Sequence, residues 1–188
     1  MVCRRPLITF ILLLIAALLF GRGSYIQCKA LLAQYLITSA WEQQLTTGVS
    51  KPPWPWADTS PIAQLTLPNQ ESLTVLAGVS GRNLAFGPTI QQLTAMPDET
   101  GNIVIYGHND THFRSLENAK INDQIRIVDR YNAERTYRIT SIRIVDMNQG
   151  DIAAQTPWDQ LTLITCYPFS PTVINGPLRF EVTAAEDK

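Results

Sequence analysis

The sequence predicts a mostly-β domain that follows an N-terminal apolar helix and a helical stalk. An uncharged, apolar run opens the chain, and residues 25–46 space their apolar side chains as a helix does. From residue 60 the pattern changes to short runs rich in β-branched and aromatic residues. Gly, Asn, Asp and Pro separate these runs, which is typical of a β-sandwich or a β-barrel. We therefore expect an anchor at 1–24, a stalk and linker at 25–59, and a β domain at 60–188.

The opening run indicates a single-pass membrane anchor. Sixteen uncharged residues lie between Arg5 and Arg22. As a helix they are about 24 Å long at roughly 1.5 Å per residue, slightly less than the roughly 30 Å of a hydrocarbon core. Arg22 can extend toward the headgroups and so make up the difference. A signal peptide has a similar pattern, but no small-x-small cleavage site follows the run, so we expect the anchor to be uncleaved. Arg4 and Arg5 then place the N-terminus in the cytoplasm and the later residues outside.

Residues 25–46 are expected to form the stalk helix. The Lys51-Pro52-Pro53-Trp54-Pro55-Trp56 run ends it, because proline lacks the N–H donor that a helix needs. Trp54 and Trp56 have two possible places, the membrane interface or the base of the domain. Packing at the base of the domain is the expected role.

The β domain is expected to contain eight strands and two helical turns. The turns fall near 89–95 and 113–119. The strands fall near 62–67, 73–77, 83–86, 102–106, 124–129, 135–146, 161–166 and 178–184.

The distribution of charge argues against a nucleic-acid-binding protein. The whole chain has a net charge of −1, and residues 51–188 hold 11 basic and 15 acidic residues, a net charge of −4. Proteins that bind nucleic acid usually present a basic patch or run, and none is present here. We therefore expect no nucleic-acid partner.

Cys166 is the residue on which the functional interpretation depends. The other two cysteines, Cys3 and Cys28, lie in or near the anchor, so nothing in the β domain can pair with Cys166. Exported domains usually hold cysteines in disulfides, and an unpaired one is either a buried structural residue or a functional thiol. Pro168 cannot continue a strand ladder, so Cys166 is expected at a strand end, rigidly held and open to substrate.

Two other residues of catalytic type are expected at strand edges. His108 follows the strand near 102–106, and Arg179 lies in the last strand on the face opposite Leu178 and Phe180. A thiolate attacks a carbonyl, an imidazole moves protons, and a fixed guanidinium stabilises developing negative charge. Alone, Arg179 is most simply a surface charge. The combination of the three residues predicts acyl transfer from a peptide.

Three alternatives stay open on the residues alone. Both histidines lie within five residues, so His108, Asp110 and His112 are candidate zinc ligands of a hydrolase. The helical zinc motif requires Glu directly after the first histidine, where this chain has Asn109. A cell-wall transpeptidase with a Ser-His-Gly-Cys run is disfavoured, because His108 and Cys166 are 58 positions apart. The third alternative is a non-catalytic, membrane-tethered β-domain that binds an envelope partner.

The chain resembles the sortase family in three motifs, which occur in the family's order over roughly residues 60–185. They are Gly107-His108 leading to Phe113, the run Thr162-Leu163-Ile164-Thr165-Cys166, and the run Leu178-Arg179-Phe180-Glu181-Val182. Three further runs look most like the single-pass, class D-like sortases of Gram-negative proteobacteria: Thr165-Cys166-Tyr167-Pro168-Phe169, Asp110-Thr111-His112-Phe113, and Trp54-Pro55-Trp56-Ala57-Asp58. Asn109 departs from that pattern, since close relatives commonly have arginine there.

The resemblance implies a closed eight-stranded β-barrel with short helices, and a membrane-anchored cysteine transpeptidase. Cys166 would be the nucleophile, His108 would donate and accept protons, and Arg179 would hold the substrate carbonyl. The implied substrate is a secreted protein with a C-terminal Leu-Pro-x-Thr-Gly-like sorting motif, transferred through a thioacyl-enzyme to an amine acceptor in the envelope. The implied location is the inner (cytoplasmic) membrane, with the catalytic domain facing the periplasm. Such thiol chemistry requires no metal or organic cofactor.

Overall fold

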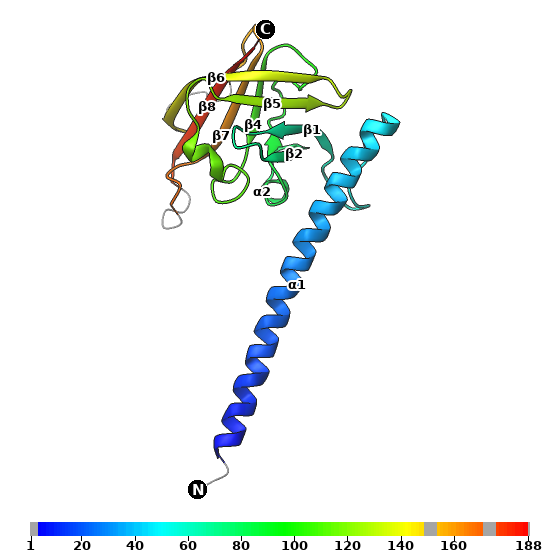
Figure 1. Ribbon diagram of the computed structural model, residues 1–188, viewed down its shortest axis with the longest axis vertical. Coiled ribbons are helices and arrows are strands. Elements are labelled where there is room, and N and C mark those ends of the chain that lie inside the picture. The colour runs from blue at the N-terminus through cyan, green and yellow to red at the C-terminus, as the bar shows by residue number, and fades with distance from the viewer. Residues whose placement is uncertain (1–3, 149–153, 171–175, 188) are drawn as a thin grey trace.

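A long helix and a β-barrel make up the molecule (Figure 1). The computed structural model describes residues 4–148, 154–170 and 176–187. The expected anchor and stalk form one continuous helix, α1 (Arg4–Thr47). Two short helical segments accompany the barrel in the described residues, α2 (Gly81–Leu84) and the 3-10 helix η1 (Arg114–Asn118).

Eight strands close the barrel in the described part of the chain, which confirms the predicted fold class. They are β1 (Pro61–Thr66), β2 (Ser72–Ala77), β3 (Thr89–Ile90), β4 (Asn102–Tyr106), β5 (Gln124–Asp129), β6 (Glu134–Asp146), β7 (Gln160–Cys166) and β8 (Leu178–Glu186). Their order around the barrel is β1-β2-β3-β4-β7-β8-β6-β5. The β2–β3 and β4–β7 pairs are parallel. The barrel is therefore mixed, and β7 lies between β4 and β8.

Alternation along the strands divides the side chains between the barrel interior and its outer face. The interior residues of the three central strands are fully buried in one core: Ile103 and Ile105 of β4, Leu161 and Leu163 of β7, and Val182 and Ala184 of β8. The intervening residues leave the sheet on its outer face. The candidate residues His108, Cys166 and Arg179 belong to this outer set by position.

The prediction of a strand near 83–86 is wrong, because residues 81–84 form α2. Ser80 caps the helix by accepting a hydrogen bond from the Asn83 backbone N–H at 3.1 Å. The Asn83 side chain donates to the carbonyls of Ala77 and Gly78 at 3.3 and 3.2 Å, which fixes the turn after β2. These polar contacts outweigh the β-like pattern of the apolar residues.

The prediction of a helical turn near 89–95 is also wrong. Thr89 and Ile90 form β3, which pairs in parallel with Leu76 and Ala77 of β2. A two-residue strand is too short to show alternation, so its sequence carries no strand signal. The turn expected near 113–119 is confirmed as η1.

The two halves of α1 have different surroundings. In the second half Ala33, Ile37, Ala40, Trp41 and Gln44 are buried, and the spacing of three and four residues places them on one face of the helix. The large apolar side chains of the first half are exposed. Figure 1 shows this half extending away from the barrel. Among the described helices, α1 is the one whose length and composition suit a membrane span.

Candidate active site

Cys166 is the last residue of β7, and it is exposed. The alternative of a buried structural cysteine is therefore wrong. The preceding residue, Thr165, is buried, and its hydroxyl donates to the Gly107 carbonyl at 2.7 Å. The nucleophile candidate thus stands at the end of a strand whose neighbouring residue is fixed in the core.

The β7–β8 ladder brings Arg179 directly opposite Cys166. Residues in opposite positions of an antiparallel pair have Cα atoms about 4.5–5.5 Å apart, and their side chains leave the sheet on the same face. Phe180 points the other way and packs against the barrel core. The face predicted for Arg179 from alternation is correct.

The parallel β4–β7 ladder brings His108 to the other side of Cys166. Its last pair is Tyr106 opposite Ile164, and the Gly107 N–H continues it by donating to the Ile164 carbonyl at 3.1 Å. Two further positions along this register would bring His108 level with Cys166, at a strand spacing of roughly 4.8 Å. The adjacent strands β4, β7 and β8 thus carry the three candidate residues, at or just beyond a strand end, to one edge of the barrel.

The loop that carries His108 is tied to the segment that follows Cys166. The Asn109 side-chain amide donates to the Pro168 carbonyl at 2.9 Å, and the Phe113 N–H donates to the His108 carbonyl at 2.9 Å. In the sequence, Asn109 is only a departure from the family pattern. The structure assigns it a contact that joins the histidine loop to the cysteine loop, and nothing in its sequence context signalled that contact.

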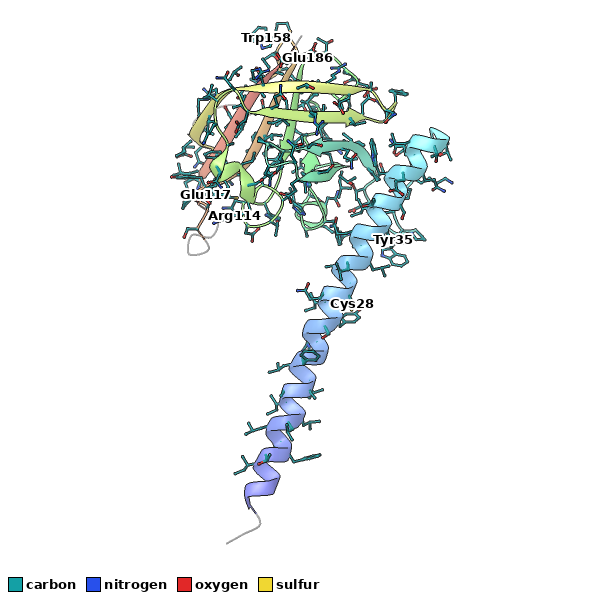
Figure 2. The ribbon with its side chains drawn as sticks, viewed as in Figure 1. Cys28, Tyr35, Arg114, Glu117, Trp158 and Glu186 are labelled. Carbon is teal, nitrogen blue, oxygen red and sulfur yellow. The ribbon has the colours of Figure 1, made fainter. Side chains whose placement is uncertain are left out.

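A second tie comes from η1. The Arg114 guanidinium donates to the Phe169 carbonyl at 2.6 Å and forms an ion pair with Glu117 at 3.2 Å. Figure 2 shows Arg114 and Glu117 at the end of the barrel that faces the N-terminal half of α1, whereas Trp158 and Glu186 lie at the other end. Because Phe169 follows Cys166 by three residues, the candidate site lies at the same end as Arg114.

Gly107 is required by close packing beside His108. A Cβ atom at this position would lie 2.7 Å from Cδ2 of Phe113, and the Phe113 side chain is fully buried. Real Cβ atoms essentially never approach a neighbour so closely. The backbone of the histidine strand therefore rests directly on an aromatic ring of the core.

The side chain of Arg179 is held by its own surroundings in this structure. Its guanidinium donates to the carbonyls of Gly176 and Leu178 at 2.7 and 2.9 Å, and it contacts the sulfur of Met147 at 3.1 Å. None of the contacts described for Arg179 is with Cys166. The backbone register is therefore in place, and the guanidinium must turn to reach a carbonyl bound at the thiol.

The backbone N–H of Tyr167, the residue after Cys166, is already engaged in the sheet. The Tyr167 N–H donates to the Leu178 carbonyl at 3.1 Å and continues the β7–β8 ladder beyond Cys166. Because this N–H group is already bonded, it is not free to stabilise an oxyanion that forms at Cys166.

A buried carboxylate lies on the same outer face of β8. Glu181 is two residues from Arg179 and only 3% exposed. Its carboxylate accepts from Arg143 of β6, at 3.1 Å from Nε. The carboxylate next to the candidate site therefore has a cationic partner on β6.

His112 lies near His108 but in a different environment. It is half-buried, and this burial is the largest cause that lowers its pKa below the ordinary value of 6.5. Positive charge on His108 lowers the pKa further, whereas Glu71 and Asp110 oppose the change. Neutral imidazole is therefore the favoured form of His112.

The geometry gives no support to the zinc alternative at His108, Asp110 and His112. Across the described residues, no three side chains of His, Cys, Asp or Glu lie close enough together to hold a metal ion.

The comparison with protein families decides what this arrangement is. The family model for the sortase domain matches residues 65–187. The chain belongs to the sortase family. Sortases are cysteine transpeptidases, and the exposed Cys166 of this sortase lies within the matched segment.

Among curated relatives, Sortase D of Bacillus subtilis (strain 168) is 38% identical over 109 residues, which is 57% of this sortase and 54% of the relative. The match thus spans about half the length of that relative. It comes from a Gram-positive bacterium, so it gives no support to the expected closeness to proteobacterial sortases.

Two solved structures illustrate the shared fold. Sortase A from Corynebacterium diphtheriae has a TM-score of 0.61 and 29% identity, with 71% of this sortase and 63% of that chain covered. A Clostridium perfringens Sortase D5 transpeptidase has a TM-score of 0.66 and 20% identity, with 84% and 99% covered. The second likeness supports the fold alone.

Proposed function

We propose that this chain is a membrane-anchored cysteine transpeptidase that acts on a C-terminal Leu-Pro-x-Thr-Gly-like sorting motif of a secreted protein. The observation that carries the proposal is the β7–β8 register, which pairs Arg179 with the exposed Cys166. The neighbouring strand β4, which runs parallel to β7 and leads into His108, supports it. Membership of the sortase family supports the same chemistry.

In the first half-reaction, the Cys166 thiolate attacks the carbonyl carbon of the motif's threonine. The C–N bond to glycine breaks, His108 protonates the departing amine, and a thioacyl-enzyme remains. In the second, His108 takes a proton from the incoming amine, which attacks the thioester and releases the Cys166 thiolate. Water can replace the amine, in which case the product is the free acid.

Arg179 is proposed to stabilise the oxyanion in both half-reactions. To do so its guanidinium must leave the Gly176 carbonyl and turn toward the carbonyl bound at Cys166. Removal of one such donor typically lowers the rate by about 10²–10³-fold. The protein supplies every group in this scheme, so neither a metal nor an organic cofactor enters it.

We further propose that residues 1–24 anchor the chain in the inner membrane, that 25–59 form the stalk and linker, and that 60–188 form the catalytic domain. Exposed apolar side chains on the first half of α1 support the anchor. Arg4 and Arg5 favour a cytoplasmic N-terminus, which leaves the barrel in the periplasm of a Gram-negative, class D-like source. Protease added to spheroplasts should then shorten the protein, and full protection would contradict this topology.

The chemical proposal is tested with full-length protein in detergent and a fluorogenic sorting-motif peptide. Cys166→Ala and His108→Ala should abolish cleavage, while the matched control His112→Ala should retain it. A chelator should leave the rate unchanged. Loss of activity on chelation and its recovery with Zn²⁺ would instead support the metal alternative.

Arg179 needs a separate test, because a structural role is the simpler interpretation. Hydroxylamine trapping of the thioacyl-enzyme measures the first half-reaction directly. Arg179→Ala should slow trapping, and Arg179→Lys should restore little of the rate because lysine lacks the planar, multi-donor guanidinium. Wild-type trapping rates in both variants would show that Arg179 only holds the carbonyl of Gly176.

A further inference from the structure

A groove lies between α1 and the barrel, far along the chain from the catalytic residues. Its volume is about 500 Å³. Apolar side chains of both parts line it: Leu32, Ala33 and Leu36 of α1, and Trp54, Trp56 and Phe86 of the domain. Trp54 packs edge-on against Phe86, with ring centroids 5.2 Å apart, as expected for a residue at the base of the domain. Trp56 differs, since it is 81% exposed. Packing within the chain therefore does not account for Trp56.

Two cationic side chains line the same groove, Lys29 of α1 and Arg82 of α2. Asp58 also lines it and contacts Arg82 at 3.5 Å, with both side chains more than half exposed. Such an exposed pair is weak and leaves most donors of the guanidinium available to another anion. The groove thus combines an exposed indole ring with two cations, on a domain whose net charge from residue 51 onward is −4.

The position of the groove along α1 fits the edge of a bilayer. The uncharged run is centred between residues 13 and 14, and half of a roughly 30 Å hydrocarbon core corresponds to about ten residues of helix. The hydrocarbon therefore ends near residue 24, and a headgroup layer of about 5–8 Å reaches to about residue 29. Exposed Tyr25 and Ile26 continue the apolar surface into this layer. Lys29 then lies at its outer boundary, which puts the Lys29 end of the groove at the headgroups and the Leu32 and Leu36 side chains just outside them.

The groove also lies at the edge of the domain that would face the membrane. Figure 1 places α2 at the edge of the barrel that faces the N-terminal half of α1. In Figure 2, Cys28 and Tyr35 mark the stretch of α1 that the groove occupies, just where the helix leaves the barrel. A membrane that contains the first half of α1 would therefore meet this edge of the domain.

We propose that the groove is a membrane-docking surface that seats Trp56 in the bilayer interface and binds the phosphate of an anionic phospholipid between Lys29 and Arg82. Indole rings favour the headgroup level, where an apolar body and a polar N–H are both satisfied. Lysine and arginine near an anionic surface attract it, and this attraction offsets the repulsion of the acidic domain. The inference rests on the proposed anchoring of α1. The test must distinguish this lipid-bound groove from one that is covered by a second copy of the chain or by a protein partner.

The test uses full-length protein in vesicles of phosphatidylcholine and phosphatidylglycerol that carry a spin-labelled lipid as a shallow quencher of tryptophan emission. Quencher in both leaflets makes the result independent of the direction of insertion. Trp158 is the internal control, because it is 60% exposed and lies at the opposite end of the barrel (Figure 2). The quenched fraction should be retained in Trp158→Phe and largely lost in Trp56→Phe.

The headgroup contact is tested with the double variant Lys29→Gln/Arg82→Gln, and exposed Lys120→Gln serves as the matched control. The double variant should lose quenching of Trp56 in vesicles that contain phosphatidylglycerol, and added salt should do the same to the wild type. Equal quenching in the double variant, or in vesicles of phosphatidylcholine alone, would overturn the anionic-lipid site.

Flotation of the vesicles separates this inference from the anchoring on which it rests. Protein that floats with the vesicles while Trp56 stays unquenched would overturn the docking surface and leave the anchor standing. A protein partner or a second copy on the groove would produce that result, because it would shield Trp56 from the lipid. Protein that remains at the bottom of the gradient would overturn both proposals.

Discussion

Substitution of Gly107 by alanine tests how closely the histidine strand rests on the core. The added Cβ would lie 2.7–3.0 Å from three atoms of the Phe113 ring, which is fully buried and cannot swing into solvent. The backbone at Gly107 does not have a positive φ, so alanine meets a steric conflict and no conformational one. Either the ring or the strand must move.

The magnitude follows from the cost of overpacking a core, which is about 1–3 kcal/mol. For a chain of this size, that corresponds to a loss of roughly 2–12 °C in melting temperature. Activity should fall further, because the displaced peptide carries His108 at its next residue. Misplacement of a catalytic group by about 1 Å can reduce a rate on the order of 10²-fold.

A double-mutant cycle with Phe113→Ala checks the reasoning. Phe113→Ala alone should cost about 3–5 kcal/mol through loss of a buried ring. The double variant should be more stable than the sum of the two single effects predicts, because the cavity accepts the new methyl group. Urea denaturation of the full chain in detergent and the cleavage rate of a motif peptide provide the two readouts. Additive stabilities would refute the proposed contact.

Three other predictions concern the surroundings of the site. Asn109→Ala removes one neutral hydrogen bond to Pro168, worth about 0.5–1.5 kcal/mol of stability. It should lower the melting temperature by only about 1–6 °C and slow acylation, and an unchanged acylation rate would mean that the contact does not position the histidine loop. Arg143→Ala leaves the buried Glu181 carboxylate unpaired and should cost about 1–3 kcal/mol in urea denaturation, most of which Glu181→Gln should restore in the same background. If the single and double variants are equally stable, Arg143 does not neutralise Glu181. Because the pKa of folded His112 is lowered from 6.5, the unfolded chain binds a proton first as pH falls below that value, and stability is lost from there down to the folded pKa. His112→Gln should flatten this fall in melting temperature, and an unchanged slope would contradict the assignment.

The strands that sequence reasoning located correctly are those long enough to alternate. β4 and β5 were predicted with their observed bounds, and β6 and β7 to within one residue at their first residue. The two errors lie next to each other, at α2 and β3. In α2 a capping serine and a bonded asparagine override the apolar pattern, and in β3 two residues are held by pairing with β2. Tertiary contacts decide such short elements, and a local pattern cannot show them.

In the candidate site too, some features could be predicted from the sequence and others could not. Strand ends and residue chemistry pointed to His108, Cys166 and Arg179, and the β7–β8 ladder pairs the last two directly. Sequence alone could not show that Arg179 is held at the carbonyl of Gly176, or that Asn109 bonds to Pro168 across the site. Both contacts join segments distant in sequence or depend on rotamers, and neither leaves a periodic trace.

The continuity of α1 has a consequence for which substrates can reach Cys166. If the first half of α1 is the proposed anchor, this helix without a break would act as a fixed-length spacer between membrane and barrel, unlike a flexible linker, which would let the domain sample many heights. With the proposed docking edge at the headgroups, the thiol would be confined to a narrow layer above the bilayer. An extended chain covers about 3.3–3.6 Å per residue, so a substrate that is itself held at the bilayer would present its motif at this height only if a limited number of residues separated the motif from the membrane. Selection by spacer length would then act alongside recognition of the motif itself.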